Sequence, residues 1–313
     1  MSRDTSAAGP TGGGSERARR ARSDPETQRE RDDVDPDAYL EPNDVDPDAY
    51  LERIGIDPGT VETPDLDTLE RLQRAHVTAV PFENLSVVGD PHGDRDAEGD
   101  GERVVLSTPH LREKVVERGR GGYCFELNGL FHSLLAVFGY DVDRVAARVV
   151  GDDGDARPPA NHHANIVELD RRYVVDVGMG VPTMRRPIPL DGTPRSDSVG
   201  VEWRIAESDR PDETYRSEYR GPGDVEWSTR YVFSDVAREF RYFEATNDYL
   251  QTAPESPFTG DPVVSVATDE GHRKLSGETL TEYVSGDERE RTVTHEEWHA
   301  TLEREFGLRY DRG

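Results

Sequence analysis

The chain has 313 residues, of which 33% are hydrophobic, and it carries 65 acidic against 38 basic residues, a formal net charge of −27. This length and composition can bury one large core or two to three small ones. The acidic excess argues against a nucleic-acid partner, because a polyanion would be repelled over most of the surface. No apolar run in the sequence approaches the length of a membrane span, and a single cysteine excludes an intramolecular disulfide. We therefore expect a cytoplasmic protein with no membrane partner.

Lysine is almost absent, since only Lys114 and Lys274 occur and arginine supplies the remaining positive charge. An acidic surface depleted in lysine is typical of proteins that stay soluble in concentrated intracellular salt. We therefore predict a halophilic host. The alternative is an ordinary acidic protein whose codon usage favours arginine.

The first 43 residues are rich in Gly, Ser, Arg and Asp and show no helical apolar period. Burial of such a segment cannot offset the entropy of ordering it, so residues 1–43 are predicted to form a disordered tail. The segment Asp33–Glu41 recurs as Asp44–Glu52, and this second copy is expected to begin the fold. One short duplication is too brief for a repeat architecture.

The next segments have helical periodicity. Pro47, directly after Asp46, favours the first turn of a helix, and a leucine stripe predicts a second helix that Pro81 ends. The polar stretch Gly89–Glu102 reads as a loop. The residues that carry the helical signals are Leu66, Leu69 and Leu72 in the second helix, Ser107, Pro109, Leu111, Val115 and Gly119 in the third, and Leu127, Leu130, Phe131, Leu134 and Leu135 in the fourth.

After Tyr140 the period changes to that of strands separated by Gly, Asp and Pro clusters. The predicted strands are Val142–Val150, Ala164–Leu169, Arg172–Val177, Val201–Ala206, Val225–Phe233, Val263–Ala267 and Arg291–Thr294, before a final helix at His295–Phe306. Helices, then strands, then a mixed segment predict an α+β fold.

The only cysteine, Cys124, lies where the glycine-rich turn of Arg120–Asn128 (RGGYCFELN) enters the fourth helix. Unpaired amides at a helix N-terminus favour a thiolate, so this position suits a nucleophile. A thiolate needs a base and a group that orients the base. His162 or His163 and Asp176 meet that need from two strands joined by a short turn. A two-residue turn would place Asp176 on the face of His163, whereas a three-residue turn would place it on the face of His162.

A rival motif, His295-Glu296-Glu297-Trp298-His299, fits the H-E-x-x-H pattern of zinc enzymes. Only fourteen residues follow His299, which leaves little room for a third ligand, and Trp298, Leu302 and Phe306 form an apolar stripe on the same helix. We therefore predict no metal.

The segment RGGYCFELN resembles the RGGxCxExN signature of the arylamine N-acetyltransferases. Four further segments are similar to segments of that family in the same order, and the resemblance covers residue 44 to the C-terminus. They are Ala75–Leu85 (AH…VPFENL), Tyr173–Gly180 (YVVDVGMG), Pro254–Phe258 and Leu275–Leu280.

The resemblance implies a Cys-His-Asp triad, acetyl-coenzyme A as cosubstrate, and a fold related to cysteine proteases and transglutaminases. It implies a helical domain at residues 44–141, a β-barrel at 142–240 and an α/β lid at 241–313, with the triad between the first two. Position-by-position comparison with the family's motifs assigns Cys124, His162 and Asp176 as catalytic residues.

Other residues receive roles from their type and place. Phe82, Phe125 and Met179 are expected to wall a pocket for a flat aromatic amine, although Met179 stands where the family usually has phenylalanine. Gly178 and Gly180 could let backbone amides approach the coenzyme pyrophosphate. An ion network of Arg120, Glu83 and Glu126 is expected to hold the cysteine loop.

We predict acetyl transfer from acetyl-coenzyme A, through a thioester on Cys124, to an arylamine or arylhydrazine. Three alternatives stay open. The same scaffold could use another acyl donor or form an amide within one molecule. A thiol hydrolase or transglutaminase-like enzyme would use the same triad on peptide amides. The third alternative is that the chain is not an enzyme but an acidic binding module that retains the remnant of a catalytic site.

Overall fold

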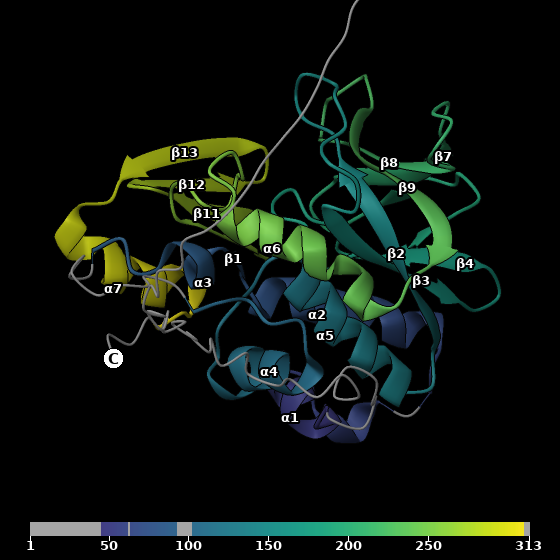
Figure 1. Cartoon of the computed structure of the whole chain (residues 1–313), viewed down its shortest axis with the longest axis horizontal. Coiled ribbons are helices and arrows are strands. Elements are labelled where there is room, and N and C mark those ends of the chain that lie inside the picture. Colours follow the sequence, from purple (N-terminus) through teal and green to yellow (C-terminus); the bar gives the residue numbers. More distant parts are fainter. Residues whose placement is uncertain (1–44, 62, 93–101, 310–313) are drawn as a thin grey trace, which may run out of the picture. The chain divides into compact units, whose positions relative to one another are not determined.

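The structure is a computed structural model that describes residues 45–61, 63–92 and 102–309. The predicted tail at residues 1–43 and most of the predicted loop at Gly89–Glu102 lie outside these ranges. In the described part, helices come first, a run of antiparallel strands follows, and helices and a second sheet complete the chain (Figure 1). This order confirms the predicted α+β class.

Aspartate residues cap the first two helices. Asp46 caps α1 (Pro47–Arg53) and Asp65 caps α2 (Leu66–Ala79), each by accepting an N–H from the first turn. The helix predicted from Ser107 changes partway into a π-helical segment. The other helical elements are η3 (Pro58–Thr60), α3 (Leu85–Val88), α4 (Thr108–Arg112), η4 (Glu113–Glu117), α5 (Cys124–Val137), η5 (Phe240–Phe243), α6 (Glu244–Thr252) and α7 (His295–Phe306).

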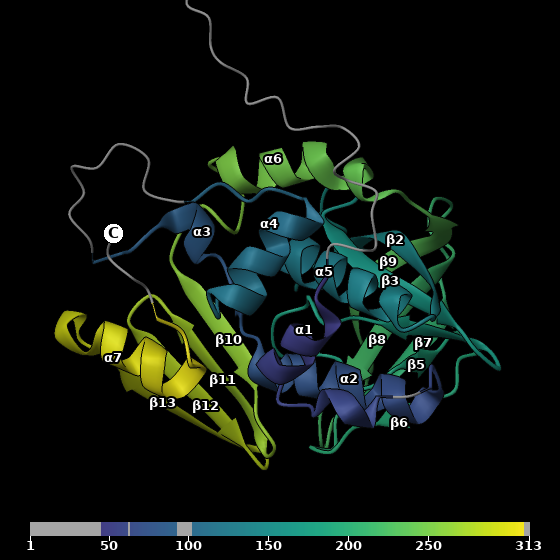
Figure 2. The same cartoon turned by 90° about the horizontal axis from the view of Figure 1, so that it is seen from below.

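The cysteine helix α5 is the centre of the helical core. It contacts α1 and α4 as well as the strands β2 (Asp141–Val149) and β3 (His162–Glu168) (Figure 2). Its apolar residues Leu127, Leu130 and Phe131 are fully buried. Because strands and helices both cover α5, its N-terminus is fixed relative to β3.

An eight-stranded antiparallel sheet follows the helices, in the order β5-β4-β3-β2-β9-β8-β7-β6. Its end strand β5 also contacts β7, so the sheet curls on itself toward a barrel. Its other strands are β4 (Arg172–Val175), β5 (Ile188–Pro189), β6 (Arg195–Ser196), β7 (Glu202–Glu207), β8 (Tyr215–Arg220) and β9 (Ser228–Ala237).

A second antiparallel sheet has the order β1-β10-β11-β12-β13. Its strands are β1 (Phe82–Glu83), β10 (Val263–Ala267), β11 (Gly271–Ser276), β12 (Thr279–Val284) and β13 (Asp287–Thr292). Helix α7 lies against this sheet in Figure 1, and Trp298, Leu302 and Phe306 are buried there, which confirms the predicted stripe.

Strand β1 belongs to the N-terminal part of the chain, yet it pairs with β10 at Phe82 opposite Ser265. It also forms a parallel bridge from Phe82 to Gly122, two residues before the cysteine. One short strand therefore joins the nucleophile turn to the second sheet. The proposed domain limits at residues 141 and 240 stay a prediction.

Candidate active site

The hairpin of β3 and β4 fixes the relation between the histidines and Asp176. Glu168 lies opposite Arg172, so three residues form the turn between the paired positions. In that register Asp176, just past β4, falls on the face of His162. The Nε2 atom of His162 lies 2.7 Å from Oδ2 of Asp176, and both side chains are buried.

His163 projects to the opposite face of β3. Its ring stacks on that of Phe243, with 4.8 Å between the centroids, and the residue is fully buried. Burial, followed by the nearby Arg144 guanidinium, lowers the pKa of His163 well below its ordinary value. The imidazole of His163 is therefore a neutral part of the core.

Asp176 is held by more than the histidine. Asn128, on α5, donates to Oδ1 of Asp176 at 2.9 Å and accepts the N–H of Val177 at the same distance. Burial by itself would raise the pKa of Asp176, but the His162 imidazole and the hydrogen bonds from Asn128 and Gly178 outweigh it and lower that pKa. The carboxylate stays ionised at neutral pH.

Cys124 is the first residue of α5 and is 3% exposed. Burial, and then the charge of Asp176, raise the pKa of its thiol. The backbone N–H groups of His163 and Phe125 hydrogen-bond to the sulfur and act in the opposite direction. Burial raises the pKa of the thiol more than these hydrogen bonds lower it. A thiolate therefore forms at Cys124 only if a base beside it takes the proton.

Cys124 and His162 both line a cavity of about 580 Å³. Its walls come from both sheets, from α6 and from the loops between them. Apart from those two residues and the glycines 178 and 180, the lining consists of Phe82, Val149, Arg157, Pro158, Asn161, Met179, Val181, Arg230, Tyr249, Leu250, Glu255, Pro257, Phe258, Val263, Ser265 and Lys274. Aromatic and aliphatic groups near the thiol suit a flat apolar ligand, and charged groups accompany them.

Two of the three predicted wall residues, Phe82 and Met179, line this cavity. Phe125 does not: its ring lies 5.3 Å from that of Phe243, inside the helical core. The reason is helical geometry, because consecutive residues of a helix point about 100° apart, and Cys124 takes the direction of the cavity.

Gly178 and Gly180 both border the cavity, but only the first is sterically required. A Cβ atom at residue 178 would lie 2.7 Å from Cα of Cys124 and 2.5 Å from Nδ2 of Asn128. At residue 180 the nearest atoms would be 3.6 Å away, an ordinary contact. Glycine at 178 thus allows the segment just after β4 to approach the nucleophile helix closely.

The two histidines of the H-E-x-x-H segment have other neighbours. Nε2 of His299 lies 3.0 Å from Oδ2 of Asp90, and the ring of His295 lies 4.1 Å from that of His92. Among the residues that the structure describes, no three His, Cys, Asp or Glu side chains are grouped so as to hold a metal ion.

In the same described residues, no helix is long and apolar enough to cross a membrane.

Sequence reasoning assigned no role to several residues around the site. Asn128 is the last residue of the RGGYCFELN segment, so the motif itself contained that signal. Gln73, on α2, donates to the backbone oxygen of Met184 at 2.9 Å and lies 3.3 Å from that of Asp176. Arg230, on β9, donates to the backbone oxygen of Gly180 at 3.1 Å, and no local pattern could have predicted that contact.

Comparison with known proteins gives a consistent result. The profile of a family described as N-acetyltransferase matches residues 65–313. An arylamine N-acetyltransferase of Mycolicibacterium smegmatis is 35% identical over 230 residues, which cover 71% of this chain and 78% of that protein. A pineal gland isozyme of arylamine N-acetyltransferase from Gallus gallus is 30% identical over 275 residues, 81% of this chain and 91% of that protein.

A solved structure shows the same likeness in three dimensions. The arylamine N-acetyltransferase of Mycobacterium marinum, in complex with CoA, superimposes with a TM-score of 0.72 at 30% identity, covering 84% of this chain and 93% of that one. With a profile that spans most of the chain and relatives matched over most of their length, the chain belongs to the arylamine N-acetyltransferase family.

Proposed function

We propose that the chain transfers an acetyl group from acetyl-coenzyme A to an arylamine or arylhydrazine, by way of a thioester on Cys124. One observation carries the proposal: the only cysteine lines the same cavity as His162, whose Nε2 lies 2.7 Å from Asp176. Because Asp176 occupies Nε2, Nδ1 is the nitrogen available to take the thiol proton.

In the first half-reaction, His162 takes the proton of Cys124 and the sulfur attacks the acetyl carbonyl carbon. The bond from that carbon to the coenzyme sulfur breaks, and coenzyme A leaves with the proton from His162. The backbone N–H groups of His163 and Phe125 act on the sulfur and favour the thiolate, and backbone amides near Cys124 would stabilise the oxyanion that forms on the acetyl oxygen.

In the second half-reaction, the amine nitrogen attacks the thioester carbon and His162 accepts the proton that the nitrogen loses. The carbon–sulfur bond breaks, which returns Cys124 and releases the N-acetylated product. Phe82 and Met179 would contact the aromatic ring, and the backbone at Gly178 and Gly180 would face the coenzyme. The ionised Asp176 stabilises the imidazolium that forms in each half.

We also propose that the enzyme works in the cytoplasm of a salt-adapted host. The support is the single cysteine, the near absence of lysine and the net charge of −27.

The covalent intermediate gives the direct test. After incubation with acetyl-coenzyme A alone, intact-mass spectrometry should show one added acetyl group, and peptide mapping should place it on Cys124. The Cys124→Ala variant should take up none. Initial rates should give parallel double-reciprocal lines, as a ping-pong scheme requires. Intersecting lines, or coenzyme release far beyond one equivalent without an amine, would favour a ternary complex or hydrolysis instead.

A further inference from the structure

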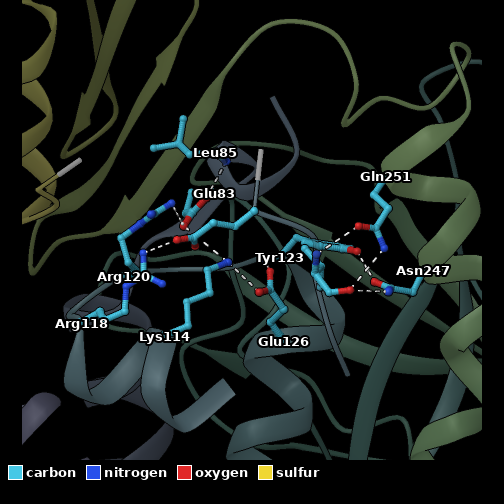
Figure 3. A network of polar contacts seen from close by, with 11 residues as sticks. Glu83, Leu85, Lys114, Arg118, Arg120, Tyr123, Glu126, Asn247 and Gln251 are labelled. Carbon is cyan, nitrogen blue, oxygen red and sulfur yellow. Dashed lines mark hydrogen bonds and ion pairs between the residues drawn. The ribbon is translucent and has the colours of Figure 1, made fainter. Parts of the chain in front are cut away.

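A buried ion network lies beneath the nucleophile turn, and it contains one of the two lysines of the chain (Figure 3). Nζ of Lys114, on η4, is 2.6 Å from Oε1 of Glu126 and 3.8 Å from Oε1 of Glu83. The guanidinium of Arg120 donates to the same Glu83 oxygen at 3.1 Å. Both carboxylates are completely buried, and the lysine side chain is 3% exposed.

This network is bonded directly to the backbone around Cys124. The second oxygen of Glu126 accepts the N–H of Tyr123, the residue before the cysteine, at 3.0 Å. Glu126 therefore caps α5 from its third position. Glu83 donates its own N–H to the backbone oxygen of Gly122 at 2.9 Å. The neighbouring Phe82 lines the cavity, so the network also holds part of the ligand wall.

A carboxylate at this place has two opposing effects. A negative charge in the first turn of α5 stabilises the helix, since it faces the positive end of the helix dipole. The same charge lies two residues from the sulfur and opposes its ionisation, adding to burial and Asp176 in raising the pKa of Cys124. A cation beside the cap offsets its charge and so reduces its opposition to thiolate formation.

Lys114 is the cation in contact with Glu126. Burial raises the pKa of Glu126; Lys114 opposes that shift, and the charge of Glu83 adds to it. For Glu83, burial is outweighed by Lys114 and Arg120, so its pKa is lowered. Among the residues that the structure describes, the two carboxylates and the two cations of this network balance in charge. Arg118 and Glu102 form a further, half-exposed pair.

We propose that Lys114 is a positioning residue of the nucleophile turn: its ammonium keeps the Glu126 carboxylate ionised and electrically balanced, so that this carboxylate caps α5 without placing a net negative charge next to Cys124. That the charge of Lys114 matters for catalysis at Cys124 rests on the proposed function. Without Lys114, Glu126 must either take up a proton or leave one uncompensated negative charge beneath the thiol.

The test compares Lys114→Met with the double variant Lys114→Met/Glu126→Gln. The readout is the rate at which iodoacetamide alkylates the protein, from pH 5.5 to pH 9. Because Cys124 is the only cysteine, the loss of free thiol reports that residue alone. The two variants differ in one ionisable group, so a pH-dependent difference between them measures the titration of Glu126.

We expect the two variants to react equally at the acid end of this range, because protonation of Glu126 in the single variant makes that side chain neutral, as glutamine is. As the pH rises, the single variant should fall behind by about threefold to tenfold, since one unit of thiol pKa is a factor of ten in thiolate. The double variant should follow the wild-type profile. Lys114→Arg, which keeps the charge, should also follow it.

Arg289→Met on the exposed strand β13 is the matched control, because it removes one positive charge at the edge of the second sheet opposite β1, the strand that carries Glu83. It should leave the profile unchanged. A constant ratio between the single and the double variant over the whole pH range would overturn the proposal and reduce Lys114 to a packing role. A failure of the wild-type protein to acetylate Cys124 would instead contradict the proposed function, because alkylation needs no acetyl donor.

Discussion

His162 and His163 are adjacent in β3 but meet different surroundings. His162 contacts the ionised Asp176 and borders the cavity, whereas His163 is enclosed against Phe243 on the other face. Only the first can take a proton from a group inside the cavity. The chemistry of a neighbouring pair is thus decided by which side of one strand each residue faces.

Substitution of the two histidines separates these roles. His162→Ala should lose both alkylation of Cys124 at neutral pH and acetyl transfer, by about a hundredfold or more as for a general base. His163→Gln should lower the melting temperature, because it disturbs a packed aromatic contact, yet keep most of the activity per folded molecule. Iodoacetamide kinetics and transfer rates, each corrected for the folded fraction, provide the comparison. The reverse pattern would assign the base to His163.

The prediction from sequence was most successful where the signal was local. The start of α1 after Asp46, the start of the cysteine helix and the stripe of α7 all depend on residues within one or two turns. The choice between the histidines depended on a turn whose length the sequence left open. The register of β3 and β4 has three residues there, so Asp176 faces His162.

At the scale of elements, long-range pairings could not be predicted. The pairing of β1 with β10 joins residues 183 positions apart, from Phe82 to Ser265, and Lys114 meets Glu83 from a separate helix. Strand β8 (Tyr215–Arg220) was missed because arginine and glutamate interrupt its apolar alternation, and those side chains form cross-strand ion pairs such as Arg204 with Glu218. Such partners become visible only after the sheet has formed.

The close approach of Gly178, in the segment after β4, to α5 gives a test at this scale. Gly178→Ala would place a methyl group within 2.7 Å of the Cys124 backbone, so the segment after β4 must move away from the helix. We expect a loss of about 1–3 kcal/mol in the free energy of unfolding and a fall in acetyl transfer. Urea denaturation and steady-state rates measure the two effects.

Gly180→Ala is the control, since its nearest neighbours would be 3.6 Å away. Its free energy of unfolding should stay within about 0.5 kcal/mol of the wild-type value. Equal destabilisation by both substitutions would mean that the backbone conformation of the loop, and not the contact with α5, requires glycine.

At the scale of the whole molecule, the dominant quantity is the net charge of −27. Arginine makes most of the surface ion pairs, for example Arg171 with Asp191 and Arg220 with Glu202, but 65 acidic residues far exceed the 38 cations that could pair with them. The unpaired acidic charges repel one another, and folding brings them closer together. Stability should therefore depend on how well the solvent screens them.

Salt supplies that screening. The Debye length falls from about 30 Å at 0.01 M to about 3 Å at 1 M, so repulsion across the surface almost disappears over this range. We expect the melting temperature and the acetyl transfer rate to rise from dilute buffer to molar KCl. Choline chloride at equal ionic strength should give most of the same gain in melting temperature, because screening does not require a particular cation. A melting temperature that stays flat in both salts would rule out the salt-adapted surface, and a gain with KCl alone would indicate specific cation binding in place of general screening.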